Sequence, residues 1–343
     1  MTKPRIAIIG AGSLGTVMGA IVTTKGGECV LVDTNKEHVA ALNQNGATVT
    51  GFMDLKNIPV TAITPGEMTG IYDIIILLIK QTANETALKA LLPYLGERSV
   101  VCTLQNGIPE PSVADVVGVS RTLGAPVGWG AGWIAPGVAQ LYTQVEHMRV
   151  ELGSLDGKIT EQLKKVEAFL KLSGEVDIST NLLGLRWSKL LMNSALSGMS
   201  AALACIFGEV LDDEKGARCA AHIANEVVRV SREKGVKLEI IIPGYDFYDL
   251  EFDNRHGRDK AISLLRAMYE RHRPSKASML QDMEKNIPCE IDYINGLVCK
   301  EGTVYNIPTP FNDTVVNIVK DFESKELGFP TIANLKYFDI PEL

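Results

Sequence analysis

A glycine-rich turn near the start of the chain has the spacing of a dinucleotide site. The apolar run 6–9 breaks into Gly-Ala-Gly-Ser-Leu-Gly, and the helical stretch 16–24 follows. In such a turn the glycines leave room for the bend, for a pyrophosphate and for close packing of helix on strand, and the helix N-terminus attracts phosphate. We therefore expect cofactor binding by Gly10, Ala11, Gly12, Ser13, Leu14 and Gly15. The alternative is a strand-to-helix turn that binds nothing.

An acidic residue after the second apolar run bears on which dinucleotide is bound. Asp33 comes directly after Cys29–Val32. A carboxylate there accepts hydrogen bonds from the ribose hydroxyls of NAD and repels the 2′-phosphate of NADP. Lys36 argues the other way, because its ammonium could hold that phosphate. On the residues alone, Asp33 favours NAD(H).

Three polar residues spaced by four interrupt the long apolar helical stretch 182–203. Lys189, Asn193 and Ser197 would share one helix face, while apolar residues cover the others. A lysine is rarely buried without a partner, so Lys189 must reach solvent, pair with a carboxylate or point into a cleft. The plainer alternative is a solvent-facing stripe.

A carboxylate that could pair with Lys189 lies about a hundred residues further on. Glu290 begins a helical stretch whose apolar positions must pack inward, namely Ile291, Ile294, Leu297 and Val298. The same carboxylate could instead serve only the N-terminus of that helix.

Two polar residues follow strand-like runs of the first half. Asn106 follows the run 100–104, and Lys80 comes directly after the run 74–79. Ligands of open α/β sheets bind beyond the carboxyl ends of the strands, so both residues are expected near the cofactor. The alternatives are an ordinary Asn-Gly turn at 106–107 and a solvated strand end at Lys80.

The elements that must position these residues change in kind along the chain. Strand-like runs alternate with helical stretches in the first half, which predicts a parallel sheet covered on both faces. From residue 159 helical periodicity dominates, and a polar helix start follows a strand-like run at 175–178. We predict an α/β domain over residues 1–178 and an all-helical domain over residues 179–343.

Composition narrows the classes of partner and location. The net charge of −7 gives no general attraction for nucleic acid or an anionic membrane, and no apolar run approaches the roughly 20 residues that cross a bilayer. The chain enters its first strand directly after Met-Thr-Lys-Pro-Arg, and its six cysteines show no CxxC pairing. We expect a cytoplasmic protein with reduced cysteines in its core. The five histidines lack ligand spacing, so no metal site is expected.

Six ordered segments of the chain resemble the ketopantoate reductase (2-dehydropantoate 2-reductase) family. They are the turn 10–15, Lys80, Gln105-Asn106-Gly107, Trp187-Ser188-Lys189 with Asn193, the segment 278–282 and the segment 290–296. The resemblance implies a Rossmann dinucleotide-binding domain followed by an all-α domain similar to the C-terminal domain of 6-phosphogluconate dehydrogenase. It also implies reduction of a small-molecule 2-oxo acid by NAD(P)H, with NADP(H) as the family default.

The resemblance assigns catalytic roles to two residues. Lys189 would be the general acid that protonates the C2 oxygen as hydride arrives, and Glu290 a second acidic group near the substrate and the nicotinamide ribose. The chemistry agrees, because a carbonyl that receives hydride develops negative charge, which a neighbouring cation stabilises and protonates. A carboxylate nearby would help to keep Lys189 protonated.

The resemblance also assigns binding roles. Asn106 and Asn193 would hold the substrate, Ser197 lies on the same substrate side, and Ser278 would bind the substrate carboxylate. Lys80 and Asn106 would in addition lie at the cofactor.

Four features depart from the family pattern. Asp33 stands where the family usually has an arginine for the NADP phosphate. Ser197 and Phe207 replace asparagines on the expected substrate side, so the substrate would be less polar than ketopantoate. The segment Pro243–Ser275 is longer than usual and is a candidate lid or dimer contact, which makes a homodimer a candidate assembly.

These observations lead to one expected function and two alternatives. We expect reduction of ketopantoate to D-pantoate, the step that serves pantothenate and coenzyme A synthesis. The first alternative is an NAD-dependent D-2-hydroxyacid dehydrogenase of the same family that acts on a more apolar 2-oxo acid. The second is a regulatory protein that senses NAD(H) without catalysis.

Overall fold

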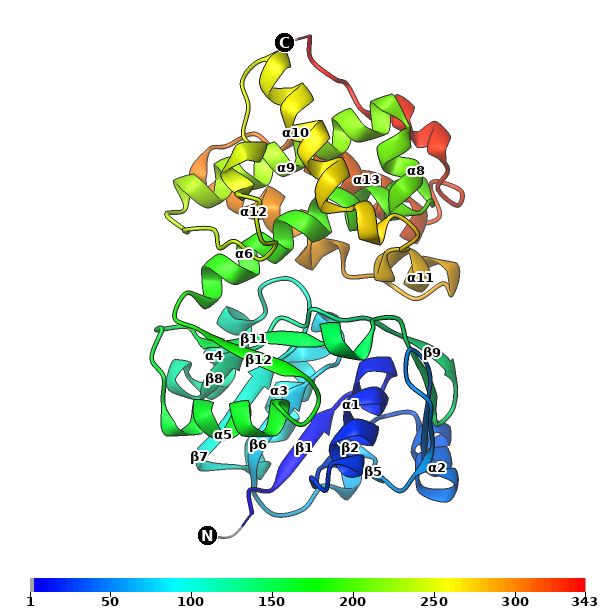
Figure 1. Cartoon of the computed structure of the whole chain (residues 1–343), viewed down its shortest axis with the longest axis vertical. Helices are drawn as coiled ribbons and strands as arrows, with labels where there is room; N and C mark the ends of the chain where they lie inside the picture. The colour runs from blue at the N-terminus through cyan, green and yellow to red at the C-terminus, as the bar shows by residue number, and fades with distance from the viewer. Residues whose placement is uncertain (1–2, 343) are drawn as a thin grey trace. The chain divides into compact units, whose positions relative to one another are not determined.

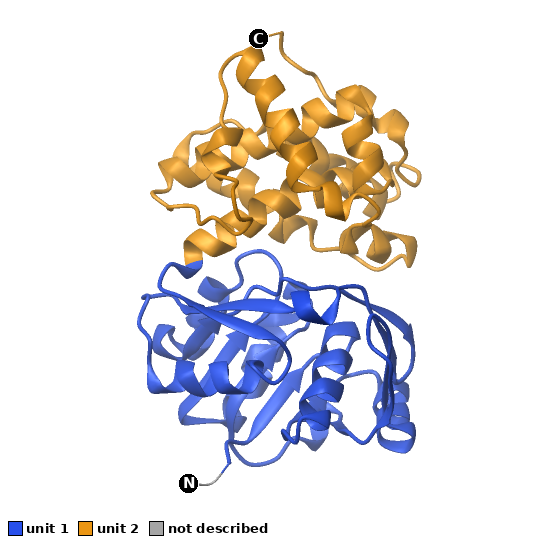
Figure 2. Ribbon diagram, viewed as in Figure 1, with its two compact units in different colours: residues 1–182 blue, residues 183–343 orange. Residues whose placement is uncertain are grey.

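A computed structural model describes residues 3–342. The chain divides into two compact units, Met1–Leu182 and Leu183–Leu343 (Figure 2). The division lies at residue 182 instead of 178, because strand β12, Glu175–Ser179, belongs to the sheet of the first unit. Leu182 also packs closely against Gly153 of that sheet.

The first unit is built on an eight-stranded sheet of order β12-β11-β8-β7-β6-β1-β2-β5 (Figure 1). Six neighbouring strands of this sheet are all parallel, namely β5, β2, β1, β6, β7 and β8, whereas β11 runs antiparallel to β8. Counted along the chain, these parallel strands stand third, second, first, fourth, fifth and sixth, which is the order of a dinucleotide-binding fold. Their bounds are β1 Ile6–Ile9, β2 Val30–Val32, β5 Thr61–Ile63, β6 Tyr72–Leu77, β7 Leu95–Thr103 and β8 Thr122–Gly124, with β11 at Arg149–Ser154.

Successive side chains of the strands point to opposite faces of this sheet, and each face has its own apolar core. Ile8 belongs to a core shared with α1 and α5, whereas Ile9 belongs to a core shared with α3 and α4. Burial on both faces explains the nearly continuous apolar sequence of the strands. The helices of this unit are α1 Ser13–Thr24, α2 Lys36–Asn45, α3 Asn84–Leu91, α4 Glu110–Val117 and α5 Glu161–Leu170.

The main strand predictions are confirmed, with shifted ends. The first strand is found at the predicted residues, while β6 ends at Leu77, so Lys80 does not follow the strand directly. The strand predicted at 100–104 begins already at Leu95. The sequence pattern did not predict β5, because its three residues are too few to show a period.

A second, four-stranded sheet of order β4-β3-β10-β9 packs against α1. Its strands are β3 Ala47–Gly51, β4 Leu55–Ile58, β9 Ala131–Ala135 and β10 Val138–Leu141. The glycine-rich segment 128–133 runs into β9. The strands β3 and β4 were missed because they are short and rich in polar residues.

The described part of the second unit, residues 183–342, contains helices and no strand. The helix predicted over 182–203 is interrupted by a π-helical turn, η6, at Asn193–Gly198. The other helices are α6 Leu182–Met192, α7 Met199–Leu203, α8 Phe207–Asp212, α9 Glu214–Glu233, α10 Arg255–Met268, α11 Ser278–Glu284, α12 Asn295–Tyr305 and α13 Pro310–Glu323.

The long segment Pro243–Ser275 is part of this helical packing. It contains α10, which packs against α9, and its aromatic residues Phe247 and Phe252 are buried. The hydroxyl of Tyr248 accepts a hydrogen bond from the backbone N–H of Leu238 at 3.1 Å. Phe247 and Phe252 therefore belong to the interior of the helical unit, and Tyr248 is half-buried at its edge.

The cysteines are free thiols, and they lie in or near the core. Cys102, Cys219 and Cys289 are buried, and the other three are half-buried. Burial raises the pKa of the Cys219 and Cys289 thiols to about 12, so both remain protonated at neutral pH. Within residues 3–342, no helix combines the length and apolar character that crossing a membrane requires.

Candidate active site

Each glycine of the turn at residues 10–15 has a geometric reason. Gly10 has φ +98°, and a Cβ there would lie 2.8 Å from the backbone nitrogen of Ile79. A Cβ on Gly15 would overlap the carbonyl oxygen of Gly10, whereas one on Gly12 would meet no atom within 4 Å. The turn thus has a sharp bend, a close helix contact and open space at its middle glycine, which are the three features a pyrophosphate site needs.

Asp33 and Lys36 lie at the adjacent strand end. Asp33 follows β2, is half-buried, and accepts a hydrogen bond from the backbone N–H of Asn35 at 2.9 Å. Lys36 is exposed at the start of α2. Hydrogen bonds from Thr64 and the nearby charge of Lys36 hold the pKa of Glu67 below its ordinary value. Glu67 is thus an exposed carboxylate near Lys36.

A buried amide network joins the loops that carry Lys80 and Asn106. The side-chain amide of Gln105 donates to the Ile79 carbonyl at 2.7 Å and to Asn84 Oδ1 at 2.6 Å. The amide of Gln81 donates to the carbonyl of Asn106 at 2.6 Å. These bonds hold the segments after β6 and β7 together, with Lys80 and Asn106 both half-buried.

Three of the predicted regions therefore meet at one edge of the sheet. The glycine turn follows β1 and contacts Ile79 after β6, and these two neighbouring strands flank the point where the strand order reverses. Ligands of this fold bind at that point. The sequence did not predict that Gln81, Asn84 and Thr103 belong to the amide network. The Gln-Asn-Gly sequence that follows β7 indicated only that polar groups lie at this strand end.

The polar stripe of the second unit, Lys189, Asn193 and Ser197, is partly accessible on a helix that is otherwise buried. Along the described helix from Gly184 to Leu203 every side chain is buried except Lys189, Met192, Asn193 and Ser197, which are half-buried. These four side chains form one accessible strip on an otherwise buried helix. None of the three polar residues is fully exposed, which argues against the alternative of a solvent-facing stripe.

The π-helical turn η6 begins at Asn193, and distant side chains satisfy carbonyl groups around it. Tyr269 donates its hydroxyl to the carbonyl of Met192 at 2.7 Å, and Asn295 donates its amide to the carbonyl of Ser194 at 3.1 Å. A Cβ on Gly198 would lie 2.5 Å from Asn295 Oδ1, so only glycine admits this amide. π-Helical turns occur frequently at functional sites.

Ser278 and Glu290 differ in exposure and in the element that carries them. Ser278 is exposed at the first residue of α11, a helix that packs against η6 and so lies beside the stripe. Glu290 is only 6% exposed and precedes the 3₁₀ turn η9, Ile291–Tyr293, without capping it through its side chain. The prediction of one helix from Glu290 onward is wrong, because Ile294 has φ −111° and ψ −95° and α12 begins at Asn295.

Two neighbours of Lys189, Arg186 and Ser188, were given no role of their own from the sequence. Arg186 is fully buried, which is rare for arginine. The hydroxyl of Ser188 donates to the carbonyl of Glu239 at 2.8 Å and accepts from its N–H at 2.9 Å. Ser188 thereby fixes α6 against the segment after α9.

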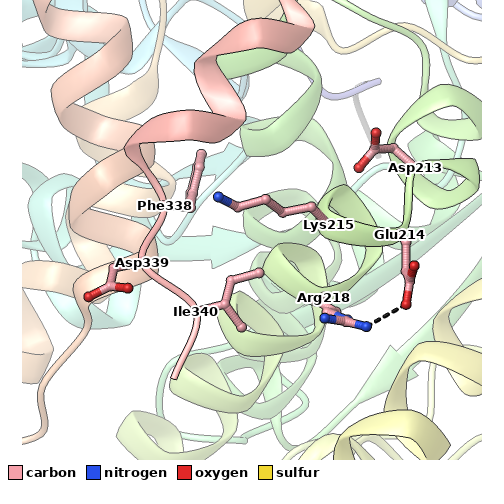
Figure 3. A pocket seen from close by; sticks show the side chains of 7 residues that line it. All are labelled: Asp213, Glu214, Lys215, Arg218, Phe338, Asp339 and Ile340. Carbon is pink, nitrogen blue, oxygen red and sulfur yellow. Dashed lines mark hydrogen bonds and ion pairs between the residues drawn. The ribbon is translucent and has the colours of Figure 1, made fainter. Parts of the chain in front are cut away.

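A pocket of about 500 Å³ elsewhere in the helical unit contains none of the predicted site residues. It lies between the start of α9 and the segment 338–340, and its charged side chains include both signs (Figure 3). Glu214 and Arg218 form an ion pair there, and Asp213 caps α9 through a hydrogen bond to the Gly216 N–H. Its polar groups thus serve the local structure. Within residues 3–342, no three His, Cys, Asp or Glu residues are grouped to hold a metal ion.

Both units of the chain match a family of known proteins. The family model described as ketopantoate reductase PanE/ApbA matches residues 6–157, and the model of its C-terminal domain matches residues 181–323. The 2-dehydropantoate 2-reductase of Lactococcus lactis is 29% identical over 93% of this chain and 98% of its own length. That of Pyrococcus horikoshii is 26% identical over 93% and 98%.

Solved structures show the same fold. A ternary structure of D-mandelate dehydrogenase with NADH and anilino(oxo)acetate has a TM-score of 0.80 at 24% identity and covers 94% of this chain and 99% of its own. A 2-dehydropantoate 2-reductase from Geobacter metallireducens has a TM-score of 0.78 at 24% identity, covering 92% and 99%. Together with the family models, these likenesses establish that the chain belongs to the ketopantoate reductase family of NAD(P)H-dependent oxidoreductases.

Proposed function

We propose that this enzyme reduces a 2-oxo acid to the 2-hydroxy acid, with 2-dehydropantoate as substrate and D-pantoate as product. The observation that carries the proposal is the half-buried stripe of Lys189, Asn193 and Ser197 on an otherwise buried helix. A cation and hydrogen-bonding side chains on one strip suit a carbonyl acid that gains negative charge as it reacts. The relatives named 2-dehydropantoate 2-reductase support this choice of substrate.

The proposed chemistry divides between the cofactor and the side chains. A nicotinamide cofactor held by the turn of residues 10–15 would supply the hydride for C2 of the oxo acid. Lys189 holds a proton at Nζ and gives it to the carbonyl oxygen, which leaves a hydroxyl on the product. Glu290 favours the charged form of Lys189 by its negative charge, against the desolvation that favours the neutral form.

Substrate and cofactor binding fall to the remaining residues. Asn106, Asn193 and Ser197 donate or accept hydrogen bonds to the oxo acid, and Ser278 binds its carboxylate. Lys80 and Asn106 also contact the cofactor, whose pyrophosphate lies at the turn of residues 10–15. The open space at Gly12 fits that group.

We further propose that NAD(H) is preferred over the family default, NADP(H). Asp33 accepts a hydrogen bond from the backbone N–H of Asn35, and its charge repels a 2′-phosphate. Lys36 has the exposed carboxylate of Glu67 nearby. Asp33→Ala should lower the KM for NADPH and leave that for NADH equal or higher. Glu37→Ala, which removes an exposed carboxylate from the neighbouring helix α2, is the control for net charge. An unchanged KM for NADPH would remove this argument.

A second candidate is an NAD-dependent D-2-hydroxyacid dehydrogenase that acts on a more apolar oxo acid. The fold is shared with a D-mandelate dehydrogenase solved with NADH, and Phe207 stands in place of an amide. In the structure Phe207 is buried edge-on against Tyr269, with ring centroids 6.0 Å apart, so it adds apolar packing behind the π-helical turn. A less polar substrate would suit that change.

One substrate panel tests both candidates. Initial rates of NADH and NADPH oxidation are measured with ketopantoate, 2-ketoisovalerate and phenylglyoxylate. We expect the highest kcat/KM with ketopantoate. A higher value with either other acid would reject the pantoate assignment in favour of the second candidate. The cytoplasmic location and the homodimer remain predictions.

A further inference from the structure

Two buried side chains hold the carbonyl group of Ala11 inside the glycine-rich turn. Thr16 Oγ1 donates to this oxygen at 2.6 Å, and His38 Nε2 lies 2.7 Å from it. Both side chains are almost fully buried. The Ala11 carbonyl and the Gly12 N–H belong to one planar trans peptide, so they point in opposite directions. Holding the carbonyl inward therefore turns the Gly12 N–H outward.

The hydrogen bonds of His38 define its tautomer. The backbone N–H of Gly137 donates to His38 Nδ1 at 2.9 Å, so Nδ1 is the acceptor of a neutral ring. The proton is then on Nε2, which donates to Ala11 and lies 3.2 Å from Thr16 Oγ1. Both ring nitrogens are occupied by backbone groups from different parts of the unit.

The far side of His38 is anchored on the second sheet. Gly137 lies in the turn between β9 and β10, and its carbonyl accepts a hydrogen bond from the Thr48 N–H of β3 at 2.9 Å. The ring of Trp133, on β9, packs on His38 with centroids 4.6 Å apart. The second sheet thus fixes His38, and His38 fixes the peptide at Ala11.

We propose that His38 is a positioning residue of the dinucleotide site. It holds the Ala11–Gly12 peptide so that the Gly12 N–H is presented to the cofactor pyrophosphate, and it transmits the position of the second sheet to the turn. This inference rests on the proposed binding of a nicotinamide dinucleotide at residues 10–15. A donor that is already fixed before binding loses less conformational entropy when the ligand binds. His38 therefore acts on cofactor affinity and not on proton transfer.

Calorimetric titration of the full chain with ADP-ribose and with NADH tests the proposal. His38→Leu removes the bond to Ala11 and should raise both dissociation constants about three- to tenfold, the effect of one lost hydrogen bond. His38→Gln can still donate to Ala11 and should recover most of the affinity. At saturating NADH, kcat should be unchanged in both variants, while the KM for NADH follows the dissociation constant.

Two controls separate positioning from general loosening. Leu42→Ala opens a cavity in the same helix, α2, where Leu42 is fully buried, and should lower thermal stability without changing ADP-ribose affinity. His147→Leu removes an exposed histidine of the same unit and should change neither. If His38→Leu does not fold, Thr16→Val removes the other donor to Ala11 and should weaken binding in the same way.

The outcomes are distinguishable. Unchanged affinity in folded His38→Leu, or an equal loss in Leu42→Ala, would overturn the positioning role while the proposed function stands. Failure of the unaltered protein to bind either ligand would instead reject the proposed dinucleotide site, and the inference with it.

Discussion

At the scale of single residues, the lysine of the polar stripe is the group on which the proposed reaction depends. Lys189 is half-buried, and its helix neighbours Ser188 and Leu190 are buried and keep the backbone fixed. A general acid needs a fixed backbone and a side chain that can reach the reacting oxygen. The exposure pattern of this helix provides both.

Lys189→Ala should lower kcat by about 10²–10⁴-fold, because the proton donor and the stabilising cation are lost together. Affinity for NADH, measured by titration, should change little. Lys189→Arg keeps the charge but cannot give up its proton near neutral pH, so it should retain more oxo-acid binding than Lys189→Ala while turnover stays low.

Lys260→Ala is the matched control, because Lys260 is an exposed lysine of α10 in the same unit. It should leave kcat unchanged. Turnover retained in Lys189→Ala would contradict the mechanism and favour a protein that binds dinucleotide without catalysis.

At the scale of elements, the π-helical turn depends on side chains from distant parts of the sequence. Tyr269 bonds a carbonyl 77 residues away and Asn295 one 101 residues away. The local periodicity over 182–203 therefore predicted the helix but not the π-helical turn within it. The glycine turn was predictable for the opposite reason, since the glycine spacing that marks it lies within six residues, and Gly15 is required by the nearby carbonyl of Gly10.

Tyr269→Phe should alter the position of Asn193 without removing any group of the stripe. It deletes the donor to the Met192 carbonyl but keeps the ring that packs against Phe207. We expect a higher KM for the oxo acid, an unchanged dissociation constant for NADH, and a loss of about 1–2 kcal/mol in the free energy of unfolding. Steady-state kinetics and urea unfolding measure these quantities.

Tyr248→Phe is the comparison for that variant, because its hydroxyl also bonds the backbone of the helical unit, at Leu238. It should cost similar stability and leave the KM unchanged. An equal rise of KM in both variants would mean that Tyr269 acts only through stability.

The N-terminus of α13 is capped by a buried glutamate with an altered pKa. Glu226 accepts hydrogen bonds from the N–H groups of Phe311 and Asn312 at 2.9 and 3.0 Å, and from the Asn312 amide at 2.7 Å. Burial raises the pKa of Glu226 from 4.5 to about 7, against these hydrogen bonds, which lower it. The Asn312 side chain in turn accepts from Asn295, which connects the cap to the π-helical turn.

Because the folded pKa of Glu226 is raised, its contribution to stability is fully present below pH 4.5 and is lost as the pH rises to about 7. The effect over this window is up to about 3 kcal/mol. Glu226→Gln should therefore flatten the pH dependence of the free energy of unfolding between pH 4.5 and 7, measured by urea unfolding. The exposed residue Glu233 of the same helix gives the control, Glu233→Gln, which should keep the full slope. An undiminished slope in Glu226→Gln would refute the assignment.

At the scale of the whole molecule, the two sheets of the first unit differ in how far the sequence predicted them. The apolar strands around the glycine turn predicted the large sheet, because each strand is buried on both faces. The second sheet was missed, since its partly polar strands are stabilised by pairing across distant segments, as in β3 with β10. The contacts of this sheet with His38 could therefore not be predicted from the sequence either.

Each unit has its own buried core, so a ligand of one unit should protect that unit first. Saturating NADH, at about 100 times its dissociation constant, should stabilise the unit of residues 1–182 by about 2.7 kcal/mol. Hydrogen exchange followed by mass spectrometry should show slower exchange in β1 and β6 and little change in α9 and α10. Equal slowing in all four elements would indicate a single cooperative unit.

The amide network after β6 and β7 also bears on how this enzyme could be re-engineered. The side chain of Gln105 donates to Ile79 and Asn84 and accepts from Thr103 at 2.8 Å and from Asn84 at 3.3 Å, so its amide orientation is fully determined. An insertion in either loop would break several of these bonds at once. Laboratory evolution toward new oxo acids should therefore accept few changes in these two loops and should find its beneficial mutations around Ser197 and Phe207.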